Sequence, residues 1–292
     1  MRRERLIARI VKKSNLGPHL IPAQSLDIVG DIAIVKLPEA QAEMKSRLAD
    51  ALLREVPSIK VVYQQTGPVA GDFRLRNLEW LAGEKRSFTT YKEHGCNFEV
   101  DVVKDYFSPR LAHERTIVAK QVKAFELGNN RGQTIVNMFA GVGTFSIRIA
   151  KETSLSRIYS IDLNPDAFTR MFRNVMSNKM LERVVCMFGD STVLVENVLR
   201  RRADRVLMPL PEKYFQYLGS AITALRPEGG IINLQNFTHA GKRMNPKKES
   251  RSQLETTLQN FRCTYIIEDE RVIRPVGPGW YQVAHDIKIM ST

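Results

Sequence analysis

Residues 137–145, NMFAGVGTF, stand where a short apolar run gives way to a helical pattern. Glycine at positions 141 and 143 lets the backbone pass close to a ligand and leaves amide groups exposed at the start of a helix. A strand, a glycine-containing turn and a helix, in this order, are typical of a parallel sheet whose strands are joined by helices. The stretch therefore predicts an α/β domain.

The same alternation continues to the end of the chain and predicts a doubly wound sheet over residues 105–292. The expected strands are residues 134–139, 157–161, 184–188, 205–208 and 230–234, with closing strands near 263–269 and 281–289. The expected helices are residues 144–151, 165–178, 212–225 and 250–260.

Residues 1–104 do not show this regular alternation of strands and helices. Their pattern predicts a smaller N-terminal α+β domain. Short extended runs fall within residues 26–35, at 61–63 and at 98–102, and residues 41–55 carry apolar side chains at helical spacing. We expect this domain to be auxiliary to the sheet domain.

Three predicted strand ends carry residues that suit an adenosine-containing cofactor. After the glycine turn, Asp162 ends the second strand, where a carboxylate can accept from both hydroxyls of a ribose, and Asp190 ends the third. The turn lacks the third glycine and the long phosphate cradle of pyrophosphate-binding loops. S-adenosyl-L-methionine (AdoMet) therefore fits better than NAD. The predicted cofactor-binding residues are Phe139, Ala140, Gly141, Val142, Gly143, Asp162, Leu163, Asp190 and Ser191.

The charge of the chain indicates a polyanionic partner. Lys and Arg number 44 against 31 Asp and Glu, a formal net charge of +13. Basic side chains near phosphates release condensed counterions, which favours nucleic-acid binding. Lys85, Arg86 and Lys92 are candidate phosphate contacts, although a solvated basic face explains them equally well.

The three cysteines stand far apart, so the sequence predicts neither a disulfide framework nor a metal site, and it places Cys186 in a buried strand. No apolar run reaches the length of a membrane span, and the basic start MRRERLIARIVKKS lacks the apolar stretch of a signal peptide. We expect a cytoplasmic protein without membrane contact, and a monomer.

Four motifs carry a family resemblance. They are FAGVGTFSI at 139–147, IYSIDLNPDA at 158–167, GDFRLRNLEWLAGEKRSFTTYKEHG at 71–95 and DYFSPRLAHER at 105–115. From about residue 26 onward the chain resembles the archaeal and eukaryotic tRNA guanine-37 N1-methyltransferases. The resemblance implies a Rossmann-like class I methyltransferase sheet, AdoMet as cofactor and tRNA as partner.

Methylation of guanine N1 has chemical requirements of its own. N1 carries a proton at neutral pH, so a base must remove it, and a cation should stabilise the charge that then develops on O6. The resemblance gives Glu114 the role of base, places Arg74 against O6 and lets Arg110 orient the guanine or Glu114. It also makes Arg115 and Pro209 substrate contacts. Without the resemblance, the sequence predicts that Glu114 belongs to a surface Glu–Arg pair at the start of a helix. His113 is expected to be its exposed neighbour.

One position departs from the family pattern. The family's fourth strand usually ends in Asn-Leu-Pro or Asn-Pro-Pro, and the Asn contacts the target base, whereas residues 208–211 here are MPLP. Pro209 keeps a carbonyl acceptor but has no side-chain amide.

Two alternative functions therefore stay open: aminocarboxypropyl transfer to, or methylation of, a wyosine precursor at tRNA position 37, and a non-catalytic tRNA-binding homologue. The related aminocarboxypropyl transferases tend to lose the arginine after the proline of the SPR motif, which this chain keeps as Arg110. Glu114 and Arg74 are kept as well, which argues against a non-catalytic protein.

Overall fold

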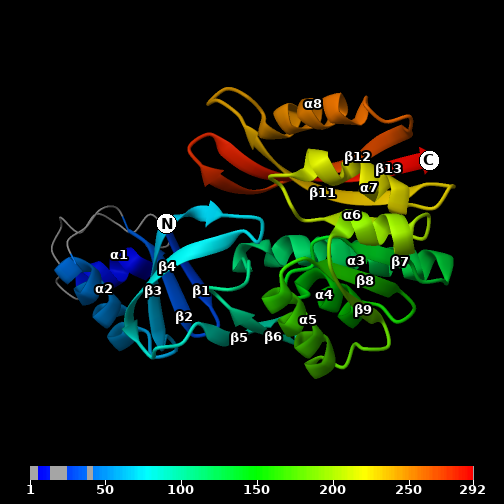
Figure 1. Ribbon diagram of the computed structural model, residues 1–292. Helices are drawn as coiled ribbons and strands as arrows, with labels where there is room; N and C mark the ends of the chain where they lie inside the picture. The colour runs from blue at the N-terminus through cyan, green and yellow to red at the C-terminus, as the bar shows by residue number, and fades with distance from the viewer. Residues whose placement is uncertain (1–5, 14–24, 38–41, 292) are drawn as a thin grey trace. The chain divides into compact units, whose positions relative to one another are not determined.

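The computed structural model describes residues 6–13, 25–37 and 42–291. The chain forms two compact units, Met1–Pro109 and Arg110–Thr292, whereas the sequence predicted the division after residue 104. Figure 1 traces both units in chain order, and each is described here by itself.

The N-terminal unit combines a four-stranded sheet with helices and a separate hairpin. The sheet has the order β1-β2-β3-β4, and helix α2 packs Leu48 and Leu52 into a core with Ala33 and Val62 of the sheet. The turn between β1 and β2 needs glycine, because Gly30 has φ +57° and a Cβ there would lie 2.2 Å from the Thr89 hydroxyl. The elements are α1 (Leu6–Lys13), β1 (Ser25–Val29), β2 (Ile32–Lys36), α2 (Ala42–Glu55), β3 (Val61–Ala70), β4 (Leu75–Gly83), β5 (Phe88–Glu93) and β6 (Cys96–Asp101).

The C-terminal unit is built on a seven-stranded sheet in the order β12-β13-β11-β10-β7-β8-β9. β9, β8, β7, β10 and β11 run parallel, and β13 is antiparallel to both β11 and β12. The strands are β7 (Thr134–Asn137), β8 (Arg157–Asp162), β9 (Val184–Phe188), β10 (Arg205–Met208), β11 (Gly230–His239), β12 (Thr264–Gly277) and β13 (Trp280–Ser291). The helices are α3 (Ala112–Asn129), α4 (Thr144–Glu152), α5 (Pro165–Ser177), α6 (Ser191–Leu194), α7 (Tyr214–Ala224) and α8 (Pro246–Leu258), with a 3₁₀ turn at Pro109–Leu111 and a π turn at Val195–Leu199.

Helices cover both faces of this sheet, with α8 on the side away from α3 and α4 (Figure 1). Alternate residues of a strand point to opposite faces. On one face, Leu234 of β11 packs with Leu218 of α7 and Leu254 of α8 in a large apolar core. The other face carries Asn233, whose amide contacts Gln121 of α3. This polar face positions the candidate active site.

The α/β fold and its strand order confirm the sequence prediction, and the bounds of β9 and β10 are those expected. The first strand of the sheet ends at Asn137, two residues earlier than predicted, because Met138 and Phe139 already belong to the cofactor turn. The long helix α3 and the strands β4 and β5 were not predicted. Cys186 lies in β9 as expected, but it is half-buried, since β9 is an edge strand.

No helix among the described residues is long and apolar enough to span a membrane. Within the same part of the chain, no cluster of His, Cys, Asp and Glu side chains could hold a metal ion.

Candidate active site

The glycine turn after β7 is tied to the end of β8 by Asp162. One carboxylate oxygen of Asp162 accepts from the Gly141 amide at 2.6 Å, and the other accepts from the Asn164 amide at 2.9 Å. Gly143 has φ +89°, and a Cβ there would lie 3.1 Å from Met171. Because each carboxylate oxygen can accept more than one hydrogen bond, Asp162 can hold the turn and still receive ribose hydroxyls.

The neighbouring strand end presents two further polar groups. The Asp190 carboxylate caps helix α6 by accepting from the amides of Thr192 and Val193 at 2.8 and 3.1 Å. The Ser191 hydroxyl is buried and has no hydrogen-bond partner in the described part of the chain. A buried hydroxyl is costly to leave unpaired, so a bound polar ligand is the natural partner.

These groups fit an adenosine cofactor without phosphates. Phe139 packs edge-on against Tyr217 at 4.9 Å between ring centroids and thereby fixes the start of the turn. Ala140 and Val142 are buried, and Leu163 is exposed beside the Asp162 carboxylate. The nine predicted cofactor residues therefore lie at three adjacent strand ends; their contacts with AdoMet stay predictions.

Glu114 lies in the first turn of α3, and its side chain is 3% exposed. It forms a bidentate ion pair with Arg271 of β12, whose Nη2 and Nε lie 2.6 and 3.0 Å from the two carboxylate oxygens. The alternative of a surface Glu–Arg pair is therefore wrong: the carboxylate is buried and its partner comes from a distant strand. His113, next to Glu114, is exposed as predicted.

Burial has the largest effect on Glu114 and raises its pKa above the ordinary value, although the hydrogen bonds and charge of Arg271 oppose this shift. A carboxylate with a raised pKa is a stronger proton acceptor. Arg271 occupies one acceptor position on each oxygen, so further lone pairs remain for a substrate proton.

Arg271 is itself held by a second buried carboxylate, Asp286 of β13, with its Nη2 2.9 Å from Oδ1. Burial opposes the ionisation of Asp286, but hydrogen bonds from Arg271, Gln121 and Asn233 outweigh it and keep its pKa below the usual value. The Glu114–Arg271–Asp286 chain is thus one network of charges that fixes the orientation of Glu114.

Glu114 and Pro209 line one small cavity of about 10 Å³, enough for a single water molecule. Pro209 follows the last residue of β10, so the cavity lies at the carboxyl end of that strand, where ligands of doubly wound sheets bind. The remaining lining residues are Val118, Phe145, Leu207, Asn233 and Gln235.

The other predicted site residues fall in different surroundings. Arg74 belongs to the N-terminal unit, where it is buried and its guanidinium lies over the Tyr106 ring at 4.0 Å. It has φ +55°, and its amide donates to Gly71 in the turn between β3 and β4. Arg110 is exposed in the 3₁₀ turn before α3, whereas Arg115 is 2% exposed. The roles assigned to all three arginines stay predictions.

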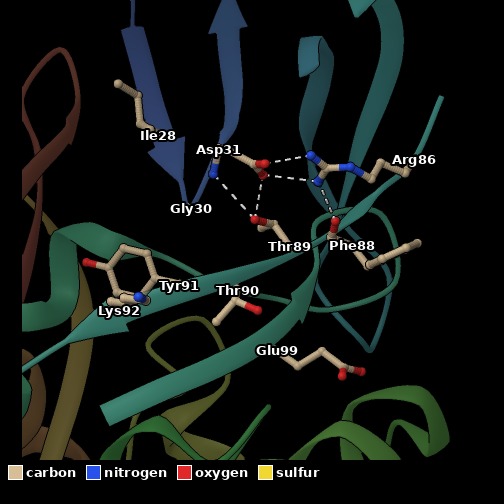
Figure 2. Close-up of a pocket in the computed structure, with 10 residues that line it drawn as sticks. All are labelled: Ile28, Gly30, Asp31, Arg86, Phe88, Thr89, Thr90, Tyr91, Lys92 and Glu99. Carbon is tan, nitrogen blue, oxygen red and sulfur yellow. Dashed lines mark hydrogen bonds and ion pairs between the residues drawn. The ribbon is translucent and has the colours of Figure 1, made fainter. Parts of the chain in front are cut away.

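The N-terminal unit also has a groove of about 750 Å³ beside the turn between β1 and β2 (Figure 2). Its Arg86 is a candidate phosphate contact, but the guanidinium is bound to Asp31 through hydrogen bonds of 2.6 and 3.0 Å. Arg86 therefore has a structural role within the unit. The same groove is also lined by the cationic side chain of Lys92 and by the apolar ring of Phe88. Phe88 is 60% exposed.

Sequence reasoning missed Arg271, Asp286 and Gln235. None of them stands in a motif, and each reaches the site only because β11, β13 and β12 are adjacent in the sheet. The pairing of antiparallel strands near the C-terminus would have been the only signal for these residues.

The doubly wound sheet, the AdoMet-type turn and the buried Glu114 carboxylate, which lines a cavity at the carboxyl end of β10, define a methyltransferase of the class I type. The sequence matches the TRM5/TYW2 methyltransferase domain over residues 89–266 and the TYW2 N-terminal domain over residues 13–86. The chain belongs to the TRM5/TYW2 methyltransferase family.

Three relatives illustrate this kinship. The chain is 36% identical to the tRNA 4-demethylwyosine(37)-methyltransferase Taw21 of Saccharolobus solfataricus, over 90% of this chain and 93% of the relative. It is 32% identical to the tRNA (guanine(37)-N(1))-methyltransferase Trm5b of Pyrococcus abyssi, over 91% of this chain and 74% of the relative. The structure of aTrm5 in complex with tRNALeu superposes with a TM-score of 0.79 at 29% identity, covering 97% of this chain and 77% of the other.

Proposed function

We propose that this protein transfers a methyl group from AdoMet to N1 of guanosine 37 in tRNA. The observation that carries the proposal is Glu114, a buried carboxylate with a raised pKa that lines a cavity at the carboxyl end of β10. The same unit holds the turn and strand ends that suit AdoMet. A base and a methyl donor are the two components that the reaction requires.

Glu114 removes the N1 proton, and Arg271 keeps the carboxylate pointed at the cavity during this step. Arg74 places its positive charge on O6, where negative charge develops, and Arg110 orients the base. Arg115 and Pro209 complete the substrate contacts.

Asp162 would hold the ribose of AdoMet, Asp190 and Ser191 would receive the adenine end, and residues 139–143 would contact the remainder. Bound AdoMet supplies a methyl group on a positively charged sulfur. The part of this chain is to orient both reactants and to keep water out of the site.

Transfer RNA is the substrate that the net charge of +13 favours. Lys85 and Lys92, both exposed in the N-terminal unit, contact its phosphates. We place the enzyme in the cytoplasm, as a monomer that works without a metal ion.

Methylation of 4-demethylwyosine at the same tRNA position is the second candidate function. Two observations favour it: the 36% identity to the Saccharolobus enzyme, and Pro209, which presents no side-chain amide to the target base. Aminocarboxypropyl transfer, a further alternative, is disfavoured by Arg110 in the SPR motif, and a non-catalytic role is disfavoured by Glu114 and Arg74.

One experiment separates these activities. The protein is incubated with AdoMet and with tRNA transcripts that carry guanosine or adenosine at position 37, or with tRNA that carries 4-demethylwyosine there. The proposal expects a gain of one methyl group on guanosine only in the first transcript, measured by mass analysis of nucleosides. Methyl gain on 4-demethylwyosine alone would establish the second function, and gain of the larger amino-acid fragment would establish the third.

A further inference from the structure

Two side-chain amides from β11 line the cavity beside Glu114, namely Asn233 and Gln235. They stand two residues apart on one strand, so both point to the same face of the sheet. Pro209, which also lines the cavity, provides no donor. The cavity can donate a hydrogen bond to an acceptor atom of the substrate only if one of these two amides has an N–H group that no protein atom uses.

Asn233 is fully engaged by protein groups. Its oxygen accepts from Arg205 at 2.7 Å, and its nitrogen donates to Asp286 and to Gln121. The bond to Asp286 links Asn233 to the Glu114–Arg271–Asp286 network. Asn233 therefore has a structural role.

Gln235 is different, because a chain of donors fixes which way its amide faces. Arg274 can only donate, and its Nε lies 2.8 Å from the Gln282 oxygen. Gln282 must therefore turn its nitrogen toward Gln235, whose oxygen accepts at 2.8 Å. Gln235 is left with its Nε2 unused: it has no partner among the described residues, although the residue is only 4% exposed.

We infer that Gln235 donates a hydrogen bond from Nε2 to the keto oxygen of the target base, beside the proton that Glu114 removes. The inference rests on the proposed function. The keto oxygen, O6, is bonded to C6, the ring carbon next to N1, and it gains negative charge by conjugation when N1 loses its proton. A preorganised donor in a buried site stabilises that charge. The donor also selects a keto purine, since adenine has an amino group at this place and would leave Gln235 unpaired.

The same geometry makes Gln282 a positioning residue. Gln282→Glu would present only acceptor oxygens to Gln235, so the Gln235 amide would turn over and show its own oxygen to the cavity. Two different substitutions should therefore remove the same donor, although Gln282 is not one of the cavity-lining residues.

The test uses single-turnover methylation of the guanosine-37 transcript by wild type, Gln235→Glu, Gln235→Met and Gln282→Glu. The three variants should be slower by about 10²–10³-fold, with AdoMet affinity and melting temperature near wild type. Gln133→Glu is the matched control: Gln133 is a buried glutamine of the same unit, and its oxygen already accepts from Arg205. It should retain the wild-type rate.

A binding measurement separates recognition from a merely structural effect and stays informative if one variant is unstable. Wild type should bind tRNA with guanosine at position 37 more tightly than tRNA with 2-aminopurine, which lacks the keto oxygen. Gln235→Met should narrow this ratio of Kd values. An unchanged ratio and wild-type rates in the Gln235 variants would overturn the inference. Absence of guanosine methylation by wild type would instead overturn the proposed function.

Discussion

At the scale of single residues, Glu114 combines two opposing influences. Burial raises its pKa and makes it a better base, while the ion pair with Arg271 opposes this rise and orients the carboxylate. An unpaired buried carboxylate would take up a proton and lose its function. The hydrogen bonds and charge of Arg271 therefore oppose the rise in the pKa of Glu114 that burial causes.

This balance predicts a pH dependence with a definite sign. Only the carboxylate form of Glu114 accepts a proton, so the methylation rate should fall as the pH drops through its raised pKa. Arg271→Lys keeps a cation but loses the bidentate geometry, which raises the pKa further and moves the ascending limb of the pH–rate profile to higher pH. Arg251→Lys alters an Arg–Glu pair with Glu270 elsewhere in the unit and should leave the limb in place.

The Asp162 carboxylate gives a second prediction at this scale. Asp162→Ala should weaken AdoMet binding about 10- to 150-fold, because charged hydrogen bonds worth about 1.5–3 kcal/mol disappear. The Gly141 amide loses its acceptor as well, so the turn itself loosens. Asp166→Ala is the control, since Asp166 pairs with Arg170 at 3.5 Å in α5. Equal affinities of the two variants by calorimetry would remove Asp162 from the site.

At the scale of elements, helix α8 is fastened to the sheet by polar contacts. The Ser250 hydroxyl lies 2.6 Å from both the Asn236 oxygen of β11 and the His285 ring of β13. Burial is the main cause that lowers the pKa of His285 to about 4. The ring is therefore neutral in the folded protein under ordinary conditions.

The depressed pKa of His285 predicts how stability depends on pH. Between about pH 6.5 and 4 the unfolded chain binds a proton at this residue and the folded chain does not, so the free energy of unfolding should fall as the pH is lowered. The His285 contribution is at most about 1.4 kcal/mol per pH unit. In urea titrations, His285→Gln should lose this component of the slope. A variant with the same slope as wild type would show that His285 is not buried as a neutral ring.

The sequence predicted the elements well where local patterns are strong and poorly where contacts are distant. The strands β9 and β10 and the glycine turn follow from apolar runs and turn residues. Helix α3 was missed because the charged Glu114 and Arg115 face inward and break its apolar periodicity. Arg271 was missed because its position opposite Glu114 depends on the pairing of β12 with β13, which no local pattern encodes.

At the scale of the whole molecule, the residues with proposed roles are distributed over the two units. Glu114 and the cofactor residues belong to the C-terminal unit, whereas Arg74 and the candidate phosphate contacts belong to the N-terminal unit. Transfer RNA is large and highly charged, so it suits a protein with a net charge of +13.

The charge of the molecule predicts salt-dependent binding. A plot of log affinity for tRNA against log salt concentration should be steep, and the double change Lys85→Ala with Lys92→Ala should reduce its slope by about 2. Arg86 is left unchanged in this experiment, because it is bound to Asp31 and its replacement would disturb the unit itself. Arg200→Ala, which removes a side chain paired with Glu196, is the control. A flat plot for wild type would contradict an interface dominated by phosphate contacts.

The role of Glu114 as the base is the central claim, and one variant tests it directly. Glu114→Gln keeps the size of the side chain and removes its ability to accept the N1 proton. The control is Glu126→Gln, a buried carboxylate of the same helix that accepts from Ser154 and Ser156 away from the cavity. The measurement is single-turnover methylation of guanosine 37 at saturating AdoMet and tRNA. The account predicts a fall of about 10²–10⁴-fold for Glu114→Gln, with both affinities within a few-fold of wild type and little change for the control. A Glu114→Gln enzyme that methylates guanosine 37 at the wild-type rate would contradict it.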